Sequence, residues 1–137
     1  MHKCSRRAAL KGLGLAAAPF IVPARVFGDE APSNRIAVGI IGTGRQSHQI
    51  NIPQFLNSPH AQVVALCDVD SWRLETVKAQ VETHYAAQTG QAYSGCAVYR
   101  DFRELIARED VDAVMISGPD HWHVPMGIAA AKAGKHF

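Results

Sequence analysis

Cysteine, clustered basic side chains and long apolar runs are all scarce in this chain of 137 residues. Its three cysteines are too few for a disulfide framework, and their spacing does not suggest a metal site. Cys67 is expected to be a buried thiol in an apolar strand, although Cys96 could in principle pair with it. No stripe of lysine and arginine offers itself to a phosphate backbone, so nucleic acid is excluded as a partner. No apolar run reaches the roughly 20 residues of a membrane-spanning helix, so no stable membrane anchor is expected.

Acidic residues are absent from residues 1–28, which hold five of the 14 lysines and arginines. A basic start, an apolar stretch over 12–22 and small residues near a cut after Ala24 or Gly28 form the three parts of an export signal. Residues 5–11 read Ser-Arg-Arg-Ala-Ala-Leu-Lys and resemble the twin-arginine motif, with alanine in place of the usual phenylalanine. We therefore expect a signal peptide over 1–28, the twin-arginine export machinery as a partner, and a periplasmic protein. A basic, alanine-rich disordered tail is the alternative.

The rest of the chain predicts one ordinary globular domain. Beyond residue 28, nine basic residues stand against 12 acidic ones, so this part is weakly acidic. An apolar content of 47% is enough to build a core, and the length suits a single domain. We take residues 29–34 as a polar leader and residues 35–137 as the domain.

Apolar runs alternate with helical patterns along this domain, in the order that a doubly wound α/β sheet requires. Because β-branched residues follow one another in the first run, that strand is expected to be buried on both faces. Residues 135–137 look like a fifth strand cut off at its start. The expected strands are 35–41, 63–67, 97–99 and 111–117, and the expected helices are 46–56, 71–87, 101–108 and 124–133.

Single residues mark several of the helix ends. Asp70 and Asp101 are placed as N-caps, where a carboxylate accepts hydrogen bonds from the first N–H groups of a helix. Pro53 is expected to kink the first helix or to end it early. Gly90 and Gly134 are expected to stop the helices before them.

The first expected strand runs into Gly42-Thr43-Gly44. Gly42 permits a sharp exit from the strand, and Gly44, which has no side chain, lets a pyrophosphate approach the N-terminus of the next helix. Ser47 takes the place of the third glycine in the Gly-x-Gly-x-x-Gly pattern, a position that serves close packing of helix on strand. The alternative is a plain strand-to-helix turn that binds no dinucleotide.

Asp68 follows Gly44 by 24 residues and is expected at the carboxyl end of the second strand. There its carboxylate can accept hydrogen bonds from both ribose hydroxyls of a dinucleotide. It would repel a 2′-phosphate, so NAD is the favoured cofactor and NADP the less favoured one. Arg45 and Arg73 lie close enough in sequence to blur this preference. The alternative is that Asp68 only opens the turn before the next helix, a role that Asp70 already fills.

The segment 117–126, Ser-Gly-Pro-Asp-His-Trp-His-Val-Pro-Met, follows the fourth expected strand. Ligands of open α/β sheets bind at this edge, so we expect a loop that packs beside the nicotinamide, with His123 near the start of the next helix. A capping and packing role for the loop is the alternative. His121 and His123 have no third ligand nearby, so no metal site is expected.

Taken together, Gly42-Thr-Gly44, Cys67-Asp-Val-Asp70, Pro119-Asp-His-Trp-His123 and the Ala-Ala-Ala-Lys-Ala-Gly-Lys-His run over 129–136 resemble the N-terminal domain of the Gfo/Idh/MocA oxidoreductases. The resemblance covers about residues 34–137. It implies a Rossmann-like domain that binds NAD or NADP, with sugars, inositols or other polyols carried on a second domain. It also implies a set of cofactor contacts: phosphates along Gly42, Thr43, Gly44, Arg45 and Gln46, the adenosine ribose at Asp68, and the nicotinamide ribose near Ser117, Pro119 and His123.

In that family a Glu-Lys-Pro motif, whose lysine assists the chemistry, comes just past the position of Phe137, and the substrate domain follows it. Neither is in this sequence, so we expect no catalytic residue here and no activity from these residues alone. The main hypothesis is the cofactor module of an exported sugar or polyol oxidoreductase. Because some exported relatives are glycosidases that use NAD transiently, the N-terminal part of such a glycosidase is an alternative. A stand-alone nucleotide-binding or interaction module is the other.

Overall fold

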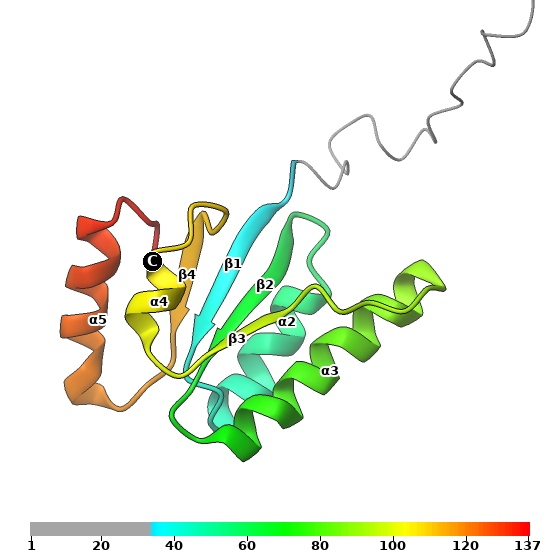
Figure 1. Cartoon of the computed structure of the whole chain (residues 1–137), viewed down its shortest axis with the longest axis horizontal. Coiled ribbons are helices and arrows are strands. Elements are labelled where there is room, and N and C mark those ends of the chain that lie inside the picture. Colours follow the sequence, from blue (N-terminus) through cyan, green and yellow to red (C-terminus); the bar gives the residue numbers. More distant parts are fainter. Residues whose placement is uncertain (1–33) are drawn as a thin grey trace, which may run out of the picture.

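The computed structural model describes residues 34–137, which form a parallel four-stranded sheet with helices on both faces (Figure 1). The strand order is β3-β2-β1-β4, so the chain builds outward from β1 in one direction and then crosses to its other side. The predicted doubly wound, Rossmann-like α/β class is confirmed. The elements are β1 (Ile36–Ile41), η3 (Ser47–Asn51), α2 (Ile52–Leu56), β2 (Ala61–Cys67), α3 (Ser71–Thr89), β3 (Ala97–Tyr99), α4 (Phe102–Ile106), β4 (Ala113–Ile116) and α5 (Asp120–Lys132).

The expected export signal over 1–28 lies outside the described residues, as does nearly all of the leader over 29–34. Within residues 34–137, no helix is both long and apolar enough to cross a membrane.

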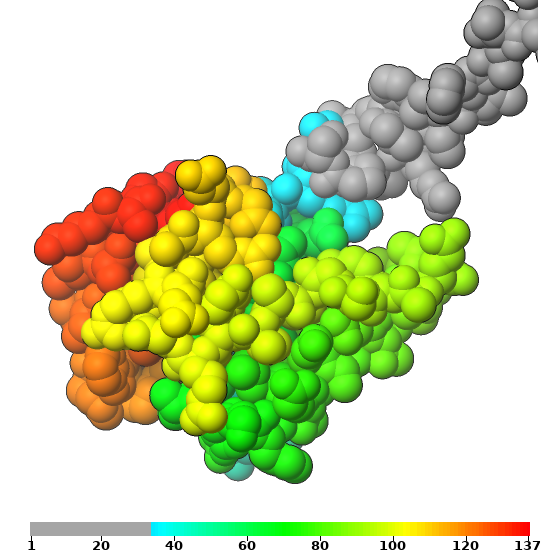
Figure 2. Space-filling view, viewed as in Figure 1, coloured from blue at the N-terminus to red at the C-terminus, as the bar shows by residue number. Residues whose placement is uncertain are grey.

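Helices α2 and α3 cover one face of the sheet, and α4 and α5 cover the other. The first core joins Val38 and Ile40 of β1 to Val77 and Val81 of α3, and the second packs Leu105 of α4 against the opposite face. Both cores need apolar side chains from the same central strands, which confirms that β1 is buried on both faces over its last four residues. The space-filling view shows α4 and its flanking segments lying over the sheet, between α5 and α3 (Figure 2).

One irregularity interrupts the pairing of β1 with β2. Val38 pairs with Val63, but the next residue, Gly39, pairs with Ala65, so β2 contains one residue more at this point. An extra residue switches the face to which every later side chain points. Leu66 consequently joins the core under α3, while Cys67 joins the core under α4, and the strand ends with Asp68 at the carboxyl edge.

The predicted helix boundaries hold where a cap residue sets them. Asp70 accepts hydrogen bonds from the N–H groups of Trp72 and Arg73, and Asp101 accepts one from Arg103 N–H, so both N-caps are confirmed. Gly90 ends α3 with φ +69°, and Gly134 follows α5 with φ +72°. These left-handed conformations suit glycine, which has no Cβ to clash.

The helix predicted over 46–56 differs from a regular α-helix. It begins with the π-helical turn η3, in which Ile52 N–H donates to the Ser47 carbonyl five residues back, and α2 follows. Pro53 lies in the first turn of α2. Its ring would crowd the carbonyl four residues earlier, and the wider turn before it relieves that contact. The helix therefore does not end at Pro53, and the irregular turn comes just before it.

The loop expected before Val124 is helical. Helix α5 starts at Asp120, with Pro119 at its N-cap position, and it continues through Pro125. The first-turn carboxylate of Asp120 favours this early start, because the N-terminus of a helix carries partial positive charge. The helix therefore begins four residues before the predicted start at Val124, and Pro125 lies inside it, one turn beyond the position that prolines favour.

Strand bounds also differ from the prediction by a few residues. β2 starts at Ala61, two residues early, and β4 is confined to Ala113–Ile116. A parallel bridge joins Ala113 to His136, with Val114 N–H donating to the His136 carbonyl at 2.8 Å. An isolated bridge beside β4 thus lies where the sequence predicted the start of a fifth strand.

Candidate functional site

The carboxyl ends of the strands bring three separate chain segments together. Gly42 N–H donates to the Cys67 carbonyl at 2.8 Å, and Ser117 N–H donates to the Ile41 carbonyl at 2.8 Å. Asp68 N–H donates to the Tyr99 carbonyl at 3.2 Å. The residues just past β1, β2 and β4 consequently share one edge, as the parallel order requires.

Gly42 makes the sharp exit from β1 that its sequence position predicts. Its φ is +95°, a value that side-chain-bearing residues rarely adopt. A Cβ at this position would also lie 2.5 Å from the Ser117 carbonyl oxygen. Both the conformation and the space therefore require glycine.

Gly44 is open where Gly42 is crowded. The nearest atom to a Cβ built on Gly44 would be the Arg73 Nη1, at 3.8 Å. The backbone turns into a helix directly afterwards, and the first helical hydrogen bond runs from His48 N–H to the Gly44 carbonyl at 2.9 Å. N–H groups that precede the first helical bond have no partner within the helix and can bind an anion.

Ser47, in the place of the usual third glycine, is fully buried. Its hydroxyl oxygen makes no hydrogen bond within the described structure. Its burial agrees with the predicted role in packing the helix on the strand. The buried hydroxyl oxygen is thus left without a hydrogen-bond partner among the described residues.

Asp68 stands at the carboxyl end of β2, with its carboxylate already held by the protein. Oδ2 accepts hydrogen bonds from the Thr43 N–H at 2.7 Å and from the Thr43 hydroxyl at 2.8 Å. Oδ1 accepts one from the Asp70 N–H at 2.9 Å. A carboxylate has about four acceptor positions, so about one is left for a ligand. The sequence analysis had expected Asp68 to accept hydrogen bonds from two ribose hydroxyls.

These contacts control the charge of Asp68. Burial raises the pKa of the carboxyl, but the hydrogen bonds from Asp70 and Thr43, together with the nearby Arg73 guanidinium, outweigh burial and hold the pKa below its ordinary value. Asp68 is therefore an anion at neutral pH.

A cleft of about 820 Å³ runs along this edge. Seven of the nine residues predicted to bind a cofactor line it, namely Gly42, Gly44, Arg45, Gln46, Asp68, Ser117 and Pro119. Thr43 is buried behind the turn, with 1% of its surface exposed, and reaches the cleft only through Asp68.

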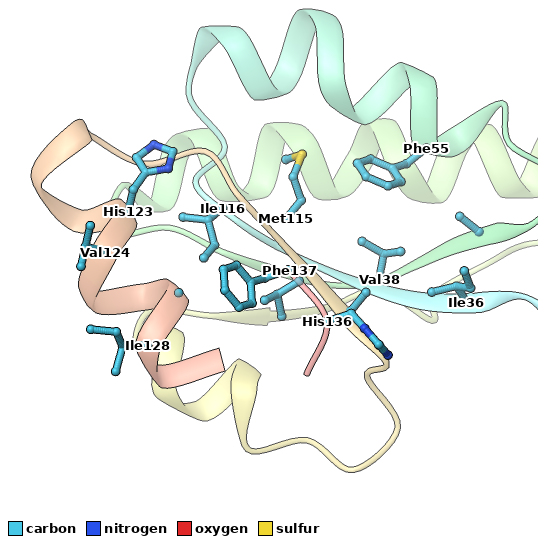
Figure 3. A pocket seen from close by; sticks show the side chains of 14 residues that line it. Ile36, Val38, Phe55, Met115, Ile116, His123, Val124, Ile128, His136 and Phe137 are labelled. Carbon is cyan, nitrogen blue, oxygen red and sulfur yellow. The ribbon is translucent and has the colours of Figure 1, made fainter. Parts of the chain in front are cut away.

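His123 lies elsewhere. It lines a second cleft, of about 870 Å³, between β1, β4, α2 and α5, at the end nearest the start of α5 (Figure 3). The walls of this cleft are mainly apolar, and Phe137 lies among them. One ring nitrogen of His123 is 2.9 Å from the Gly118 carbonyl oxygen, so His123 meets the first cleft only through that backbone group.

Sequence reasoning missed the residues that β3 and α4 contribute to the first cleft. Arg100, Asp101 and Arg103 line it from the segment that follows β3. Arg100 donates to the Val69 carbonyl at 2.7 Å and so ties the end of β3 to the end of β2. The available signal was positional: β3 pairs with β2, so whatever follows β3 reaches the same edge.

The charges of the first cleft are mixed. Four arginines line it, at positions 45, 73, 100 and 103, against aspartates at positions 68, 70 and 101. Arg73 Nε lies 3.3 Å from Asp70 Oδ2, and Arg103 Nη1 lies 3.1 Å from Asp101 Oδ1. The slight excess of positive charge suits an anionic ligand that also carries hydroxyl groups.

Metal and thiol chemistry find little support in this part of the chain. Across residues 34–137, no group of three histidine, cysteine or acidic side chains is placed to hold a metal ion. Cys67 and Cys96 are buried and unpaired with each other. Burial, with the carboxylates of Asp68, Asp101 and Glu104, raises the pKa of the Cys67 thiol to about 12, so the reactive thiolate is scarce at neutral pH.

Residues 36–137 match the Gfo/Idh/MocA family, described as an oxidoreductase family with an NAD-binding Rossmann fold. The chain belongs to this family. The described residues are its N-terminal NAD-binding domain, and the sequence resemblance that predicted it is confirmed.

Relatives of two kinds extend the comparison. A glycosyl hydrolase family 109 protein from Solibacter usitatus is 33% identical over 99% of this chain, and an α-N-acetylgalactosaminidase from Shewanella oneidensis is 34% identical over 81%. This chain covers 32% and 24% of those proteins, so it spans at most about a third of their length.

Among solved structures, a scyllo-inositol dehydrogenase from Lactobacillus casei with NAD(H) and scyllo-inositol superimposes with a TM-score of 0.60 and 28% identity. A 3-ketoreductase from Actinomadura kijaniata with NADP gives 0.63 and 25%. These matches cover 74% and 75% of this chain, and 26% and 29% of the other chains. Members with this Gfo/Idh/MocA domain thus occur with either dinucleotide.

The residues present fit NAD. A Cβ on Gly44 would fill the open space beside the glycine turn, and the helix that follows the turn offers unpaired N–H groups. Asp68 keeps about one acceptor position open beside the same turn. These are the groups that a pyrophosphate and an adjoining ribose require.

Proposed function

We propose that the first cleft, at the carboxyl edge of the sheet, binds NAD in preference to NADP. The observation that carries this proposal is the Asp68 carboxylate, ionised and held by Thr43 beside the glycine turn. A ribose hydroxyl can donate to such a carboxylate, whereas a 2′-phosphate would meet it as a like charge. The pyrophosphate would lie over Gly42, Gly44, Arg45 and Gln46.

When bound, NAD supplies the capacity to accept a hydride. The chain's own residues bind and orient it. Ser117 and Pro119 border the same cleft and are proposed to lie beside the nicotinamide half. His123 contributes there by holding the Gly118 carbonyl, and we propose no direct contact of its ring with the cofactor.

Binding is tested by titrating NAD and NADP into the full chain by calorimetry. Asp68→Ala is expected to weaken NAD binding by at least about tenfold, because it removes a hydrogen bond to a charged group. Asp112→Ala is the matched control, since its carboxylate accepts the Ala37 N–H at 2.8 Å and lies outside this cleft. A wild-type chain that gives no heat with NAD, or an Asp68→Ala variant with unchanged affinity, would overturn the proposal.

For the whole protein we propose NAD-dependent chemistry on a sugar. The curated relatives named glycosyl hydrolase family 109 protein and α-N-acetylgalactosaminidase favour cleavage of a glycoside. The neighbours named scyllo-inositol dehydrogenase and 3-ketoreductase favour net oxidation or reduction of a sugar or polyol instead. We favour the glycosidase, because the sequence relatives match over more of this chain and at higher identity.

Activity assays on the natural gene product that contains this chain distinguish the glycosidase from the oxidoreductase. Release of nitrophenol from nitrophenyl α-N-acetylgalactosaminide, without net formation of NADH, supports the glycosidase. Steady NADH formation from an inositol or a sugar supports the oxidoreductase. Binding of NAD with neither reaction supports the stand-alone nucleotide-binding module. That residues 1–137 catalyse nothing by themselves stays a prediction, which the same assays check.

We further propose export by the twin-arginine route, on the Ser-Arg-Arg-Ala-Ala-Leu-Lys run over residues 5–11. A folded reporter fused to residues 1–34 is expected to reach the periplasm of a bacterium with this pathway. Replacing Arg6 and Arg7 together by lysine keeps the charge and is expected to stop export. Unchanged transport of the lysine variant would contradict the proposal.

A further inference from the structure

Thr43 is the middle residue of the glycine turn, but its side chain points away from the cleft. It is almost wholly buried, with 1% of its surface exposed. Its hydroxyl and its N–H both donate to the same atom, Asp68 Oδ2, at 2.8 Å and 2.7 Å. The family resemblance suggested that Thr43 lies along the phosphates, whereas the structure directs its only polar side-chain atom to the end of β2.

We propose that Thr43 is a positioning residue whose hydroxyl fixes the Asp68 carboxylate in the orientation that selects NAD over NADP. This inference rests on the proposed function, because it assumes that the cleft binds a dinucleotide. It concerns a residue that need not touch the ligand.

The geometry separates the role of the hydroxyl from the roles of the backbone. Two of the three hydrogen bonds on Asp68 come from the main-chain N–H groups of Thr43 and Asp70, which any residue at those positions would supply. The hydroxyl is the one bond that depends on the identity of residue 43. The two Thr43 donors on Oδ2 and the Asp70 N–H on Oδ1 together hold the carboxylate in one orientation, and the acceptor position that stays unfilled is on Oδ1.

The surrounding charges explain why the orientation matters for the choice of cofactor. Arg73 lowers the pKa of Asp68 and also pairs with Asp70, 3.3 Å away. A carboxylate that turned away or took up a proton would leave this guanidinium to meet a 2′-phosphate. The hydrogen bonds from Thr43 favour the ionised carboxyl and so oppose both changes.

The experiment compares NAD and NADP binding to the full chain for wild type, Thr43→Val and Thr43→Ser. Valine keeps the shape of threonine and removes the donor, while serine keeps the donor. Thr76→Val is the matched control, because the Thr76 hydroxyl bonds only to the Trp72 carbonyl within α3 and lies outside the cleft. Circular dichroism establishes that each variant is folded.

For Thr43→Val we expect NAD to bind about three- to tenfold more weakly, as for the loss of one hydrogen bond to a charged group, with NADP binding unchanged or tighter. Thr43→Ser is expected to restore the wild-type ratio of NAD to NADP affinity. Equal weakening of both dinucleotides would indicate a merely structural role and overturn the inference. An unchanged ratio would overturn it too.

A second measurement does not depend on binding. Carbon-detected NMR titration of the Asp68 carboxyl is expected to give a higher pKa in Thr43→Val than in wild type, and a wild-type pKa in Thr43→Ser. The other charged or titratable groups around the site are Cys67 on β2, Asp70 and Arg73 at the start of α3, Arg45 after the glycine turn, and Arg100, Asp101 and Arg103 after β3. An unchanged pKa in Thr43→Val would overturn the positioning role even if NAD binds. A wild-type chain that binds no NAD but shows the pKa change would instead overturn the proposed function, and with it the selection of NAD.

Discussion

The Ser117 carbonyl oxygen occupies the space that a side chain on Gly42 would need, 2.5 Å from the position of a Cβ. Gly42 directly follows β1, and Ser117 directly follows β4, 75 residues later in the chain. Because of this contact, the turn proposed to hold the phosphates packs directly against the segment proposed to border the nicotinamide. The stability of the fold and the shape of the cleft therefore depend on the same glycine.

Replacement of Gly42 by alanine is expected to lower the free energy of unfolding by more than about 2 kcal/mol, because backbone strain at φ +95° adds to the clash with Ser117. Gly90→Ala is the control, since Gly90 also has positive φ but no atom lies within 4 Å of its Cβ position. In Gly90→Ala, backbone strain alone is expected to lower the free energy of unfolding by about 1 kcal/mol. Urea unfolding followed by circular dichroism measures both, and equal losses would contradict the role of the Ser117 contact.

Replacement of Gly44 by alanine is expected to leave stability nearly unchanged and to abolish detectable NAD binding. A Cβ at this position meets only the Arg73 Nη1, at 3.8 Å, so the apo fold accommodates it. The same methyl group would occupy the space into which a pyrophosphate must come. Calorimetry with NAD and thermal unfolding test the two halves separately. Full-affinity binding by Gly44→Ala would show that the phosphates lie elsewhere.

The pH dependence of folding is expected to carry the signature of Asp68. Its pKa is lowered in the folded chain, so its contribution to stability is present above the unfolded pKa of about 3.9 and is lost as the pH falls through the folded value. The stability advantage of wild type over Asp68→Asn is therefore expected to be full near neutral pH and to shrink below about pH 4. Urea unfolding of both proteins across the acid range measures it. If the stability advantage of wild type over Asp68→Asn grew as the pH fell, the prediction would be wrong.

Ser47→Ala is expected to raise stability by about 1 kcal/mol, because it removes a buried hydroxyl without a partner and alanine favours helices. For a domain of this size that corresponds to a rise of about 4–8 °C in the unfolding temperature. Ser71→Ala, at an exposed position in the first turn of α3, is the control and is expected to change stability by less than about 0.5 kcal/mol. A lower unfolding temperature for Ser47→Ala would show that its hydroxyl has a partner.

Local features were predictable wherever a few neighbouring residues set them. The caps at Asp70 and Asp101 and the helix stops at Gly90 and Gly134 depend on backbone geometry within one turn. The start of α5 at Asp120 was not predicted. Pro119 and Pro125 lie six residues apart, and a proline near either position is compatible with the beginning of a helix.

The amino-acid sequence by itself determined the alternation of strands and helices, the glycine turn and the acid after the second strand, since these follow from hydrophobic pattern and local conformation. Tertiary structure alone decided that the Thr43 hydroxyl holds Asp68, that Arg100 reaches the cleft from β3, and that His123 lines the other cleft. Each of these depends on which strands are neighbours, and the place of Asp68 also depends on the extra residue in β2. Such distances between segments far apart in the chain are fixed only when the elements pack.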